Sequence, residues 1–234
     1  MEIKGRLNLI ADKVPVCEVL CDVGTDHAYL PVYLIKQGKC GRIIASDAKA
    51  GPIRVARKNI TLYGMEDKIE TRLGYGIETI EENEADVIVI AGMGGELIVE
   101  ILRRGIKKAK RCRCLILQAM NSIDILHRWL YENGFNIYDE ELAVEGEKIY
   151  CVICAKWTGE EGAEDCLYYY IGKKLVEKHD PLLPAYIKKS ITRLDKAISS
   201  MKEQTDKWPD ILGEYENLNN RMKTLLGEVC KHGC

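Results

Sequence analysis

The segment from Val19 to Pro31, VLCDVGTDHAYLP, constrains the fold of this chain most. An apolar run reaches Asp22, Gly24 follows it, and a helical pattern begins near Ala28. That is the order of strand, tight turn and helix in a nucleotide-binding α/β domain. The G-x-G-x-x-G dinucleotide fingerprint is absent, because Asp26 stands at its second glycine position. A carboxylate there repels a pyrophosphate but not a cation. The segment therefore indicates a sulfonium donor, S-adenosylmethionine, against the alternative of a strand–turn–helix that binds nothing.

Alternating patterns continue along the chain and predict a class I methyltransferase sheet. Apolar runs predict seven strands, with a turn at 145–147 between the last two. Helical spacing predicts an entry helix and one helix after each of several strands, without a helix between the last two strands. The predicted strands are 16–23, 42–47, 68–73, 85–91, 112–118, 136–144 and 148–157, and the predicted helices are 5–14, 28–38, 51–63, 96–104 and 122–133. The last strand is expected to insert antiparallel, whereas a Rossmann dehydrogenase would continue with further βαβ units.

Composition excludes several classes of protein. The chain has 234 residues, of which 47% are hydrophobic, and a net charge of −2, so no overall basic charge favours nucleic acid. No apolar run approaches the roughly 20 residues of a membrane span, and the first residues read as an amphipathic helix rather than a signal peptide. We therefore expect a cytoplasmic protein whose ten cysteines are reduced. Cys151 and Cys154 lie in a strand pattern that puts their sulfurs on opposite faces, so we expect buried small hydrophobes and no metal site.

A second acid, Asp47, ends the second predicted strand 25 residues after Asp22. A carboxylate at that place can accept hydrogen bonds from both ribose hydroxyls. The alternative is an N-cap for the helix that starts near Lys49. Tyr75 follows the third strand, where an adenine ring would lie, and could line that pocket or be a loop aromatic. The candidate donor-binding residues are Asp22, Gly24, Thr25, Asp26, His27, Asp47, Ala48, Asn59, Gly74, Tyr75, Gly76, Ala91 and Gly92.

Four motifs together resemble one known family. They are DVGTDHAYLP at 22–31, Asp47 followed by GPIRVARKN at 51–59, AGMGG at 91–95 and LILQ at 115–118. The combination is similar to the bacterial tRNA (adenine(22)-N1)-methyltransferases, from Arg6 to about Trp157. The resemblance implies a class I fold, S-adenosylmethionine as donor, and an adenine in the D-arm region of tRNA as acceptor. The chain departs from the family pattern at Tyr75, where an acid is usual, and at Ala119, where a proline is usual.

The chemistry that the resemblance implies needs positioning more than proton transfer. Adenine N1 already carries a lone pair, so the base need only be exposed or flipped and held in line with the methyl group. Glycines after the fourth strand let a base approach the backbone, or alternatively form a tight turn into the next helix. His27 could orient donor or base, or instead make a structural hydrogen bond. The candidate catalytic residues are Asp26, His27, Gly92, Met93 and Gly94.

Two basic regions are candidates for contact with tRNA. The run 103–113 holds seven basic residues, although a solvated helix end also favours cations. The second region lies on the first helix of a C-terminal arm. The candidate RNA-binding residues are Arg103, Arg104, Lys107, Lys108, Lys188, Lys189 and Arg193.

The predicted organisation is a methyltransferase domain at 1–157, a linker at 158–165 and a helical unit at 166–234. Two apolar stripes at heptad-like spacing, interrupted at Trp208-Pro209, predict an antiparallel, coiled-coil-like hairpin. We expect a monomer or a weak dimer. The remaining alternatives are an enzyme of this fold acting on another RNA or on a small molecule, and a scaffold without catalysis.

Overall fold

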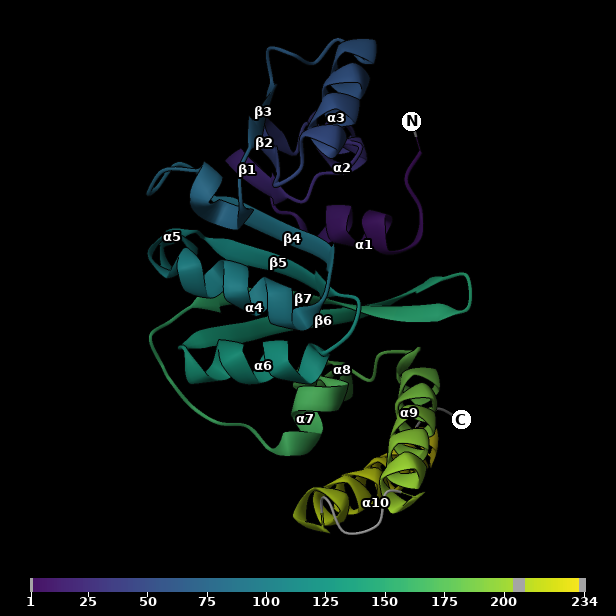
Figure 1. The fold of residues 1–234 in the computed structure, drawn as a ribbon. Helices are drawn as coiled ribbons and strands as arrows, with labels where there is room; N and C mark the ends of the chain where they lie inside the picture. Colours follow the sequence, from purple (N-terminus) through teal and green to yellow (C-terminus); the bar gives the residue numbers. More distant parts are fainter. Residues whose placement is uncertain (1, 204–208, 232–234) are drawn as a thin grey trace. The chain divides into compact units, whose positions relative to one another are not determined.

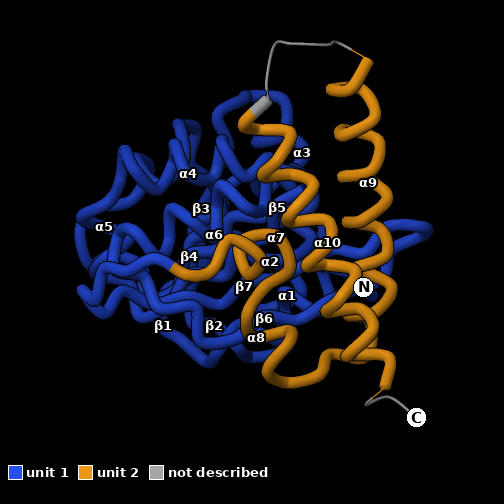
Figure 2. Tube along the Cα trace, turned by 90° about the horizontal axis from the view of Figure 1, so that it is seen from below, with its two compact units in different colours: residues 1–163 blue, residues 164–234 orange. Residues whose placement is uncertain are grey.

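The computed structural model describes residues 2–203 and 209–231. Of the predicted helix break at Trp208-Pro209, Trp208 lies outside the described residues and Pro209 begins a helix. The chain divides into two compact units, residues 1–163 and residues 164–234, coloured separately in Figure 2. Unit 1 holds the whole sheet and six α-helices, and unit 2 is made of helices only (Figure 1).

A seven-stranded sheet forms the centre of unit 1, as the sequence predicts. Its strand order is β3-β2-β1-β4-β5-β7-β6, and β7 runs antiparallel to both of its neighbours, β5 and β6. β4 has no exposed surface over its first four residues because helices cover both faces of the sheet. The strands are β1 Cys17–Val23, β2 Cys40–Asp47, β3 Ile69–Leu73, β4 Val87–Met93, β5 Cys114–Ala119, β6 Phe135–Glu145 and β7 Lys148–Trp157. The parallel strands therefore bring their carboxyl ends to one edge.

The helices of unit 1 form two groups. α1 and α3 both pack against α2, while α4 packs against α5 and α6 on the other side of the sheet (Figure 1). The helices are α1 Gly5–Lys13, α2 Tyr29–Lys36, α3 Ala50–Leu62, α4 Gly95–Arg104, α5 Ile106–Arg111 and α6 Ile123–Glu132, with a 3₁₀ turn η1 at Gly76–Thr79. The sequence analysis did not predict η1 or α5. Gly105 stands between α4 and α5, and a side chain there would collide with Ile77.

The cysteines of unit 1 are buried, which confirms that they pack as small hydrophobes. Cys17 and Cys40 are register partners on β1 and β2, and their sulfurs lie 3.5 Å apart. In residues 2–203 and 209–231, no group of three or more His, Cys, Asp or Glu side chains is arranged to hold a metal ion. None of the helices described there is long and apolar enough to cross a membrane.

Unit 2 contains α7 Cys166–Ile171, α8 Lys173–Glu177, α9 Leu183–Glu203 and α10 Pro209–Lys231. The two long helices pack against each other (Figure 2). The predicted stripes are only partly right: Ile198 is buried where the prediction placed Ala197, and Ile211 is exposed. Asn219, which is buried, donates a 2.6 Å hydrogen bond to Asp195 across the pair. A buried polar contact of this kind fixes how two helices align.

Candidate donor and acceptor site

The loop after β1 is held against the end of β2. The N–H groups of Gly24 and Thr25 both donate to the carbonyl of Ser46, at 2.8 and 3.0 Å. Gly24 has φ +77°, a left-handed conformation that favours glycine. Asp26 and Ala28 also have positive φ, at 44° and 56°, which is uncommon for residues with a side chain. Such strain concentrates at sites where the geometry of the backbone serves a ligand.

Asp22 is a buried acid at the end of β1, with only 6% of its surface exposed. Burial raises the pKa of Asp22 to about 6, and the charge of Asp47 adds to the rise. The hydroxyl of Thr25 lies near the carboxyl and opposes the rise, although its Oγ1 makes no hydrogen bond of good geometry. Among the described residues, no lysine or arginine forms an ion pair with Asp22 or Asp47. Neither acid is therefore neutralised by an ion pair within the described residues.

Asp47 lies at the end of β2, one strand away from Asp22. Its Oδ1 accepts a 2.7 Å hydrogen bond from the N–H of Lys49, the residue that precedes α3. Lys49 rather than Asp47 is the N-cap of α3, and no side chain caps that helix, so the alternative cap role is not realised. The contact with Lys49 uses only one carboxylate oxygen. The side chain is half-buried and keeps an accessible edge for a second partner. Ala48, beside it, is exposed.

The loop after β3 does not present Tyr75 as a free aromatic. The guanidinium of Arg104 lies 4.6 Å from the centre of the Tyr75 ring. The N–H of Gly74 donates to the backbone carbonyl of Asp47 at 3.0 Å, so a hydrogen bond connects the loop after β3 to the end of β2. Gly76 is packed against Ile101 of α4, where a Cβ would collide. The predicted pocket residues are therefore connected to the Asp47 loop through Gly74 and to α4 through Tyr75.

Asn59, a donor-binding candidate on α3, points back to the loop after β1. Its Nδ2 donates a 2.8 Å hydrogen bond to the carbonyl of His27. The His27 ring lies 3.5 Å from Asp26 through Nε2 and Oδ2, and both side chains reach solvent. Asn59 thus holds the strained loop by its backbone, which makes it a positioning residue.

The AGMGG segment forms the turn into α4, and its geometry also leaves the approach of a ligand open. β4 continues through this segment to Met93, two residues further than predicted. Gly92 has φ +77° and open space where a side chain would stand, so a ligand can approach its backbone. Gly95 starts α4 in such close contact with the backbone of Ser122 that no larger residue fits. The side chain of Met93 reaches the loop after β1. Its methyl carbon lies so close to Gly24 that a Cβ on Gly24 would be only 2.3 Å away.

Gln118 is a site residue that the sequence analysis named only as part of a motif. It is completely buried at the end of β5, and its Oε1 accepts a 3.1 Å hydrogen bond from the N–H of Gly92. Its Nε2 donates to the carbonyl of Ala119 at 2.7 Å. A polar side chain closing an apolar strand was the signal that could have identified it. Gly94, the next candidate, lies close to the side chain of Asn121.

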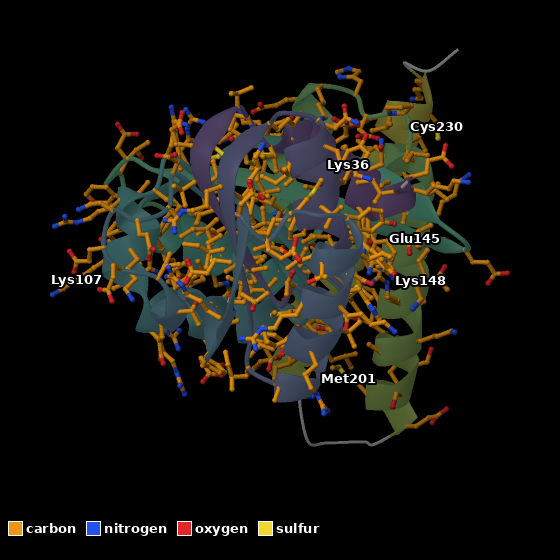
Figure 3. All side chains as sticks on the ribbon, turned by 90° about the horizontal axis from the view of Figure 1, so that it is seen from above. Lys36, Lys107, Glu145, Lys148, Met201 and Cys230 are labelled. Atoms are coloured by element: carbon orange, nitrogen blue, oxygen red, sulfur yellow. The ribbon has the colours of Figure 1, made fainter. Side chains whose placement is uncertain are left out.

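The basic run 103–113 is not one uniform surface. Arg104 forms an ion pair with Glu100 at 2.6 Å, and Lys108 donates to the carbonyls of Ile77 and Glu78. Arg111 and Arg113 likewise contact unit 1 itself, through Glu82 and the carbonyl of Val16. Arg103 and Lys107 make no ion pair within the described residues, and Figure 3 shows Lys107 pointing outward at the edge of unit 1. On α9, Lys188, Lys189 and Arg193 are exposed.

These groups fit a donor that is cationic and carries a ribose. A buried carboxylate without a cation favours a positive ligand, because the ligand supplies the charge that the site lacks. Open space at Gly92 and a half-buried carboxylate at Asp47 provide room for a ligand and an acceptor for hydroxyls. The carboxylate of Asp26, at the second glycine position of the dinucleotide fingerprint, repels a pyrophosphate. The arrangement thus agrees with S-adenosylmethionine and disagrees with a dinucleotide.

Comparison with known proteins gives the same result. Residues 3–153 match a family model described as a methyltransferase domain. The chain is 33% identical to the tRNA (adenine(22)-N(1))-methyltransferase of Bacillus subtilis, with 100% of this chain and 99% of that protein covered. The crystal structure of B. subtilis TrmK has a TM-score of 0.82 at 29% identity, covering 97% of this chain and 98% of the other.

A second solved structure is that of Mycoplasma capricolum TrmK in complex with the cofactor product S-adenosyl-homocysteine. It has a TM-score of 0.78 at 25% identity, and 98% of each chain is covered. The matches span nearly all of this chain, including the helices after residue 163. From these similarities and the geometry of the loops, the chain belongs to the tRNA (adenine(22)-N1)-methyltransferase family.

Proposed function

We propose that this chain transfers a methyl group from S-adenosylmethionine to N1 of adenine 22 in the D-arm region of tRNA. The observation that supports the donor most strongly is the buried Asp22, which has no cationic partner in the described chain and stands beside the left-handed Gly24. Family membership supports the acceptor, since it extends over the full length of the B. subtilis enzyme.

Each loop at the carboxyl edge has a part in this proposal. Asp47 accepts the ribose hydroxyls with the oxygen that Lys49 does not use. Asp22 places negative charge near the cationic end of the donor, and Gly24 with Thr25 forms the wall of that end. Gly74 and Tyr75 lie beside the adenine ring of the donor. Ala91 and Gly92 form the floor between donor and target base, and Asp26, His27, Met93 and Gly94 surround that floor.

The reaction needs alignment and a dry site. The donor supplies a methyl carbon that is electrophilic because it is bound to a sulfonium. The lone pair of adenine N1 forms the new bond while the carbon–sulfur bond breaks, so no proton has to leave first. The backbone at Gly92 sets the position of the base edge, and Gln118 fixes Gly92. Exclusion of water and fixed geometry then lower the barrier.

Two alternatives predict different results. An enzyme for a small molecule, or for another RNA, would bind the donor but leave adenine 22 unmethylated. A scaffold would bind tRNA or another partner without turnover. We further propose that the chain acts in the cytoplasm, and we keep the prediction of a monomer or a weak dimer.

The test uses the full chain, labelled donor and an unmodified tRNA transcript, with nucleoside mapping of the product. A matched transcript with guanine in place of adenine 22 is the control. Methylation of the first transcript and not of the second is expected. Methylation of both would place the target elsewhere in the RNA. Donor binding by calorimetry without methylation of either transcript would contradict the proposed function.

A further inference from the structure

Two aromatic side chains stand together at the donor loop. The rings of His27 and Tyr29 have their centres 5.3 Å apart and their planes within 10° of parallel. Tyr29 is the first residue of α2 and is 43% exposed. Nothing in the proposed function uses Tyr29. The pair is therefore a candidate for a contact that the donor alone does not explain.

Hydrogen bonds hold the backbone around this pair. His27 lies between Asp26 and Ala28, the two left-handed residues of the loop. Ala28 is completely buried, its N–H donates to the carbonyl of Thr25 at 2.8 Å, and Asn59 binds the carbonyl of His27. A side chain on a loop whose backbone is held by hydrogen bonds on both sides loses less freedom when it meets a ligand. The stack is thus preorganised.

The pair stands near the floor of the site. It follows Gly24 along the same loop, and Met93 of the β4 loop reaches Gly24. Two further large apolar side chains are exposed close to that floor in sequence: Leu97 in the first turn of α4 and Met120 after β5, both at 39%. Exposed apolar groups beside a catalytic floor indicate a binding surface.

We propose that the His27–Tyr29 pair is a stacking platform for the target adenine after it leaves the RNA stack. The inference rests on the proposed function. An extruded base loses its neighbours, and an aromatic side chain replaces them by contacting the face of the base. The N1 lone pair lies in the plane of the ring. A contact that uses only the face therefore leaves N1 free to meet the methyl carbon. A hydrogen bond to N1 would instead occupy the reacting atom.

The experiment compares three variants of the full chain with the parent protein. Tyr29→Ala removes the platform, Tyr29→Phe keeps the ring, and Tyr138→Ala removes a similarly exposed tyrosine (40%) near Cys114, at the amino end of β5. Steady-state methylation of the tRNA transcript gives kcat and KM, and calorimetry gives the affinity for S-adenosylmethionine.

Base stacking on one aromatic side chain corresponds to a change of roughly 5- to 150-fold. We expect Tyr29→Ala to lower kcat/KM for tRNA within that range while the donor affinity stays within about twofold. Tyr29→Phe and Tyr138→Ala should stay close to the parent. With 2-aminopurine in place of adenine 22, the complex of Tyr29→Ala should fluoresce more strongly than that of the parent, because stacking quenches this base.

Three results would overturn the inference. One is turnover by Tyr29→Ala within about twofold of the parent. The second is an equal loss of donor affinity, which would make Tyr29 part of the donor site. The third is a loss in Tyr29→Phe as large as in Tyr29→Ala, because the hydroxyl and not the ring would then be responsible. If the parent binds donor but methylates no transcript, the proposed function fails as well, which separates that case from a failure of the platform alone.

Discussion

The buried amide oxygen of Gln118 accepts a hydrogen bond from the N–H of Gly92, so the end of β5 sets the position of the open backbone on β4. Gly92 has no side chain and a left-handed φ, which leaves it dependent on this contact. The relationship ties one apolar strand to the floor on which the target base is proposed to lie.

Replacement of this amide should damage both stability and turnover. Gln118→Leu keeps the approximate volume but leaves the N–H of Gly92 and the carbonyl of Ala119 without their partner. We expect the free energy of unfolding to fall by about 1–3 kcal/mol, as for buried groups left unpaired. Methyl transfer should fall by roughly tenfold or more because the floor loosens. Urea unfolding and single-turnover assays measure the two effects, and Gln37→Leu, at an exposed site, is the control. Normal turnover in Gln118→Leu would remove the positioning role.

The acidity of Asp22 predicts how donor binding depends on pH. Its pKa is raised to about 6, so the folded protein holds a proton that the unfolded chain releases near pH 4. Stability therefore falls as pH rises from about 4 to about 6, by about 3 kcal/mol at most, and stays lower above that range. A cationic donor favours the ionised carboxyl. Donor affinity should thus increase as pH rises through 6.

Calorimetry at pH 5.5 and 7.5, in two buffers of different ionisation enthalpy, checks this linkage. At pH 5.5 binding should release protons, and at pH 7.5 it should release almost none. Asp22→Asn should abolish the pH dependence, weaken the donor complex and stabilise the free protein at neutral pH. Equal affinity at both pH values in the parent protein would show that Asp22 does not face the positive charge of the donor.

The ribose contact assigned to Asp47 predicts a loss of donor affinity. Asp47→Ala should weaken S-adenosylmethionine binding by roughly 1.5–3 kcal/mol, the range for a hydrogen bond to a charged group. The loss of the bond to Lys49 should cost less, because that N–H reaches solvent. Calorimetry on folded variants is the measurement, with Asp67→Ala at an exposed turn as the control. Unchanged affinity would place the ribose elsewhere.

The sequence predicted the sheet well because strand periodicity and turns are local signals. All seven predicted strands are present, and β7 inserts antiparallel as expected. Contacts between distant segments were invisible to the same reasoning. Arg111 pairs with Glu82, which lies in the loop before β4. The position between α4 and α5 suits Gly105 because Ile77 leaves no room for a side chain there. Gln118 likewise acquires its role only when β4 and β5 lie side by side.

These contacts sharpen the prediction for the basic run. Since Arg104 and Lys108 are engaged within unit 1, Arg103 and Lys107 are the residues left to meet phosphates. Replacing both by alanine should weaken tRNA binding and reduce the slope of log affinity against log salt by about 1.4–1.8. Donor affinity should not change. Filter binding at several salt concentrations measures the slope, and Lys148→Ala with Glu147→Ala, at the hairpin tip of β6 and β7, is the control. A slope equal to that of the parent would leave the run as a solvated surface.

Unit 2 is expected to hold the tRNA rather than the donor. The donor loops and the sheet all lie in unit 1, whereas α9 carries the exposed Lys188, Lys189 and Arg193. A chain of residues 1–163 should therefore bind S-adenosylmethionine with nearly the parent affinity, because the predicted donor contacts remain. It should lose most of its tRNA affinity and methylation, since a large substrate has to be gripped at a distance from the reacting base. Donor titration tests the retained affinity for S-adenosylmethionine, and gel-shift assays test the loss of tRNA affinity. Circular dichroism checks that the shortened chain is folded. Methylation at the full-length rate would assign unit 2 to dimerisation or to another partner.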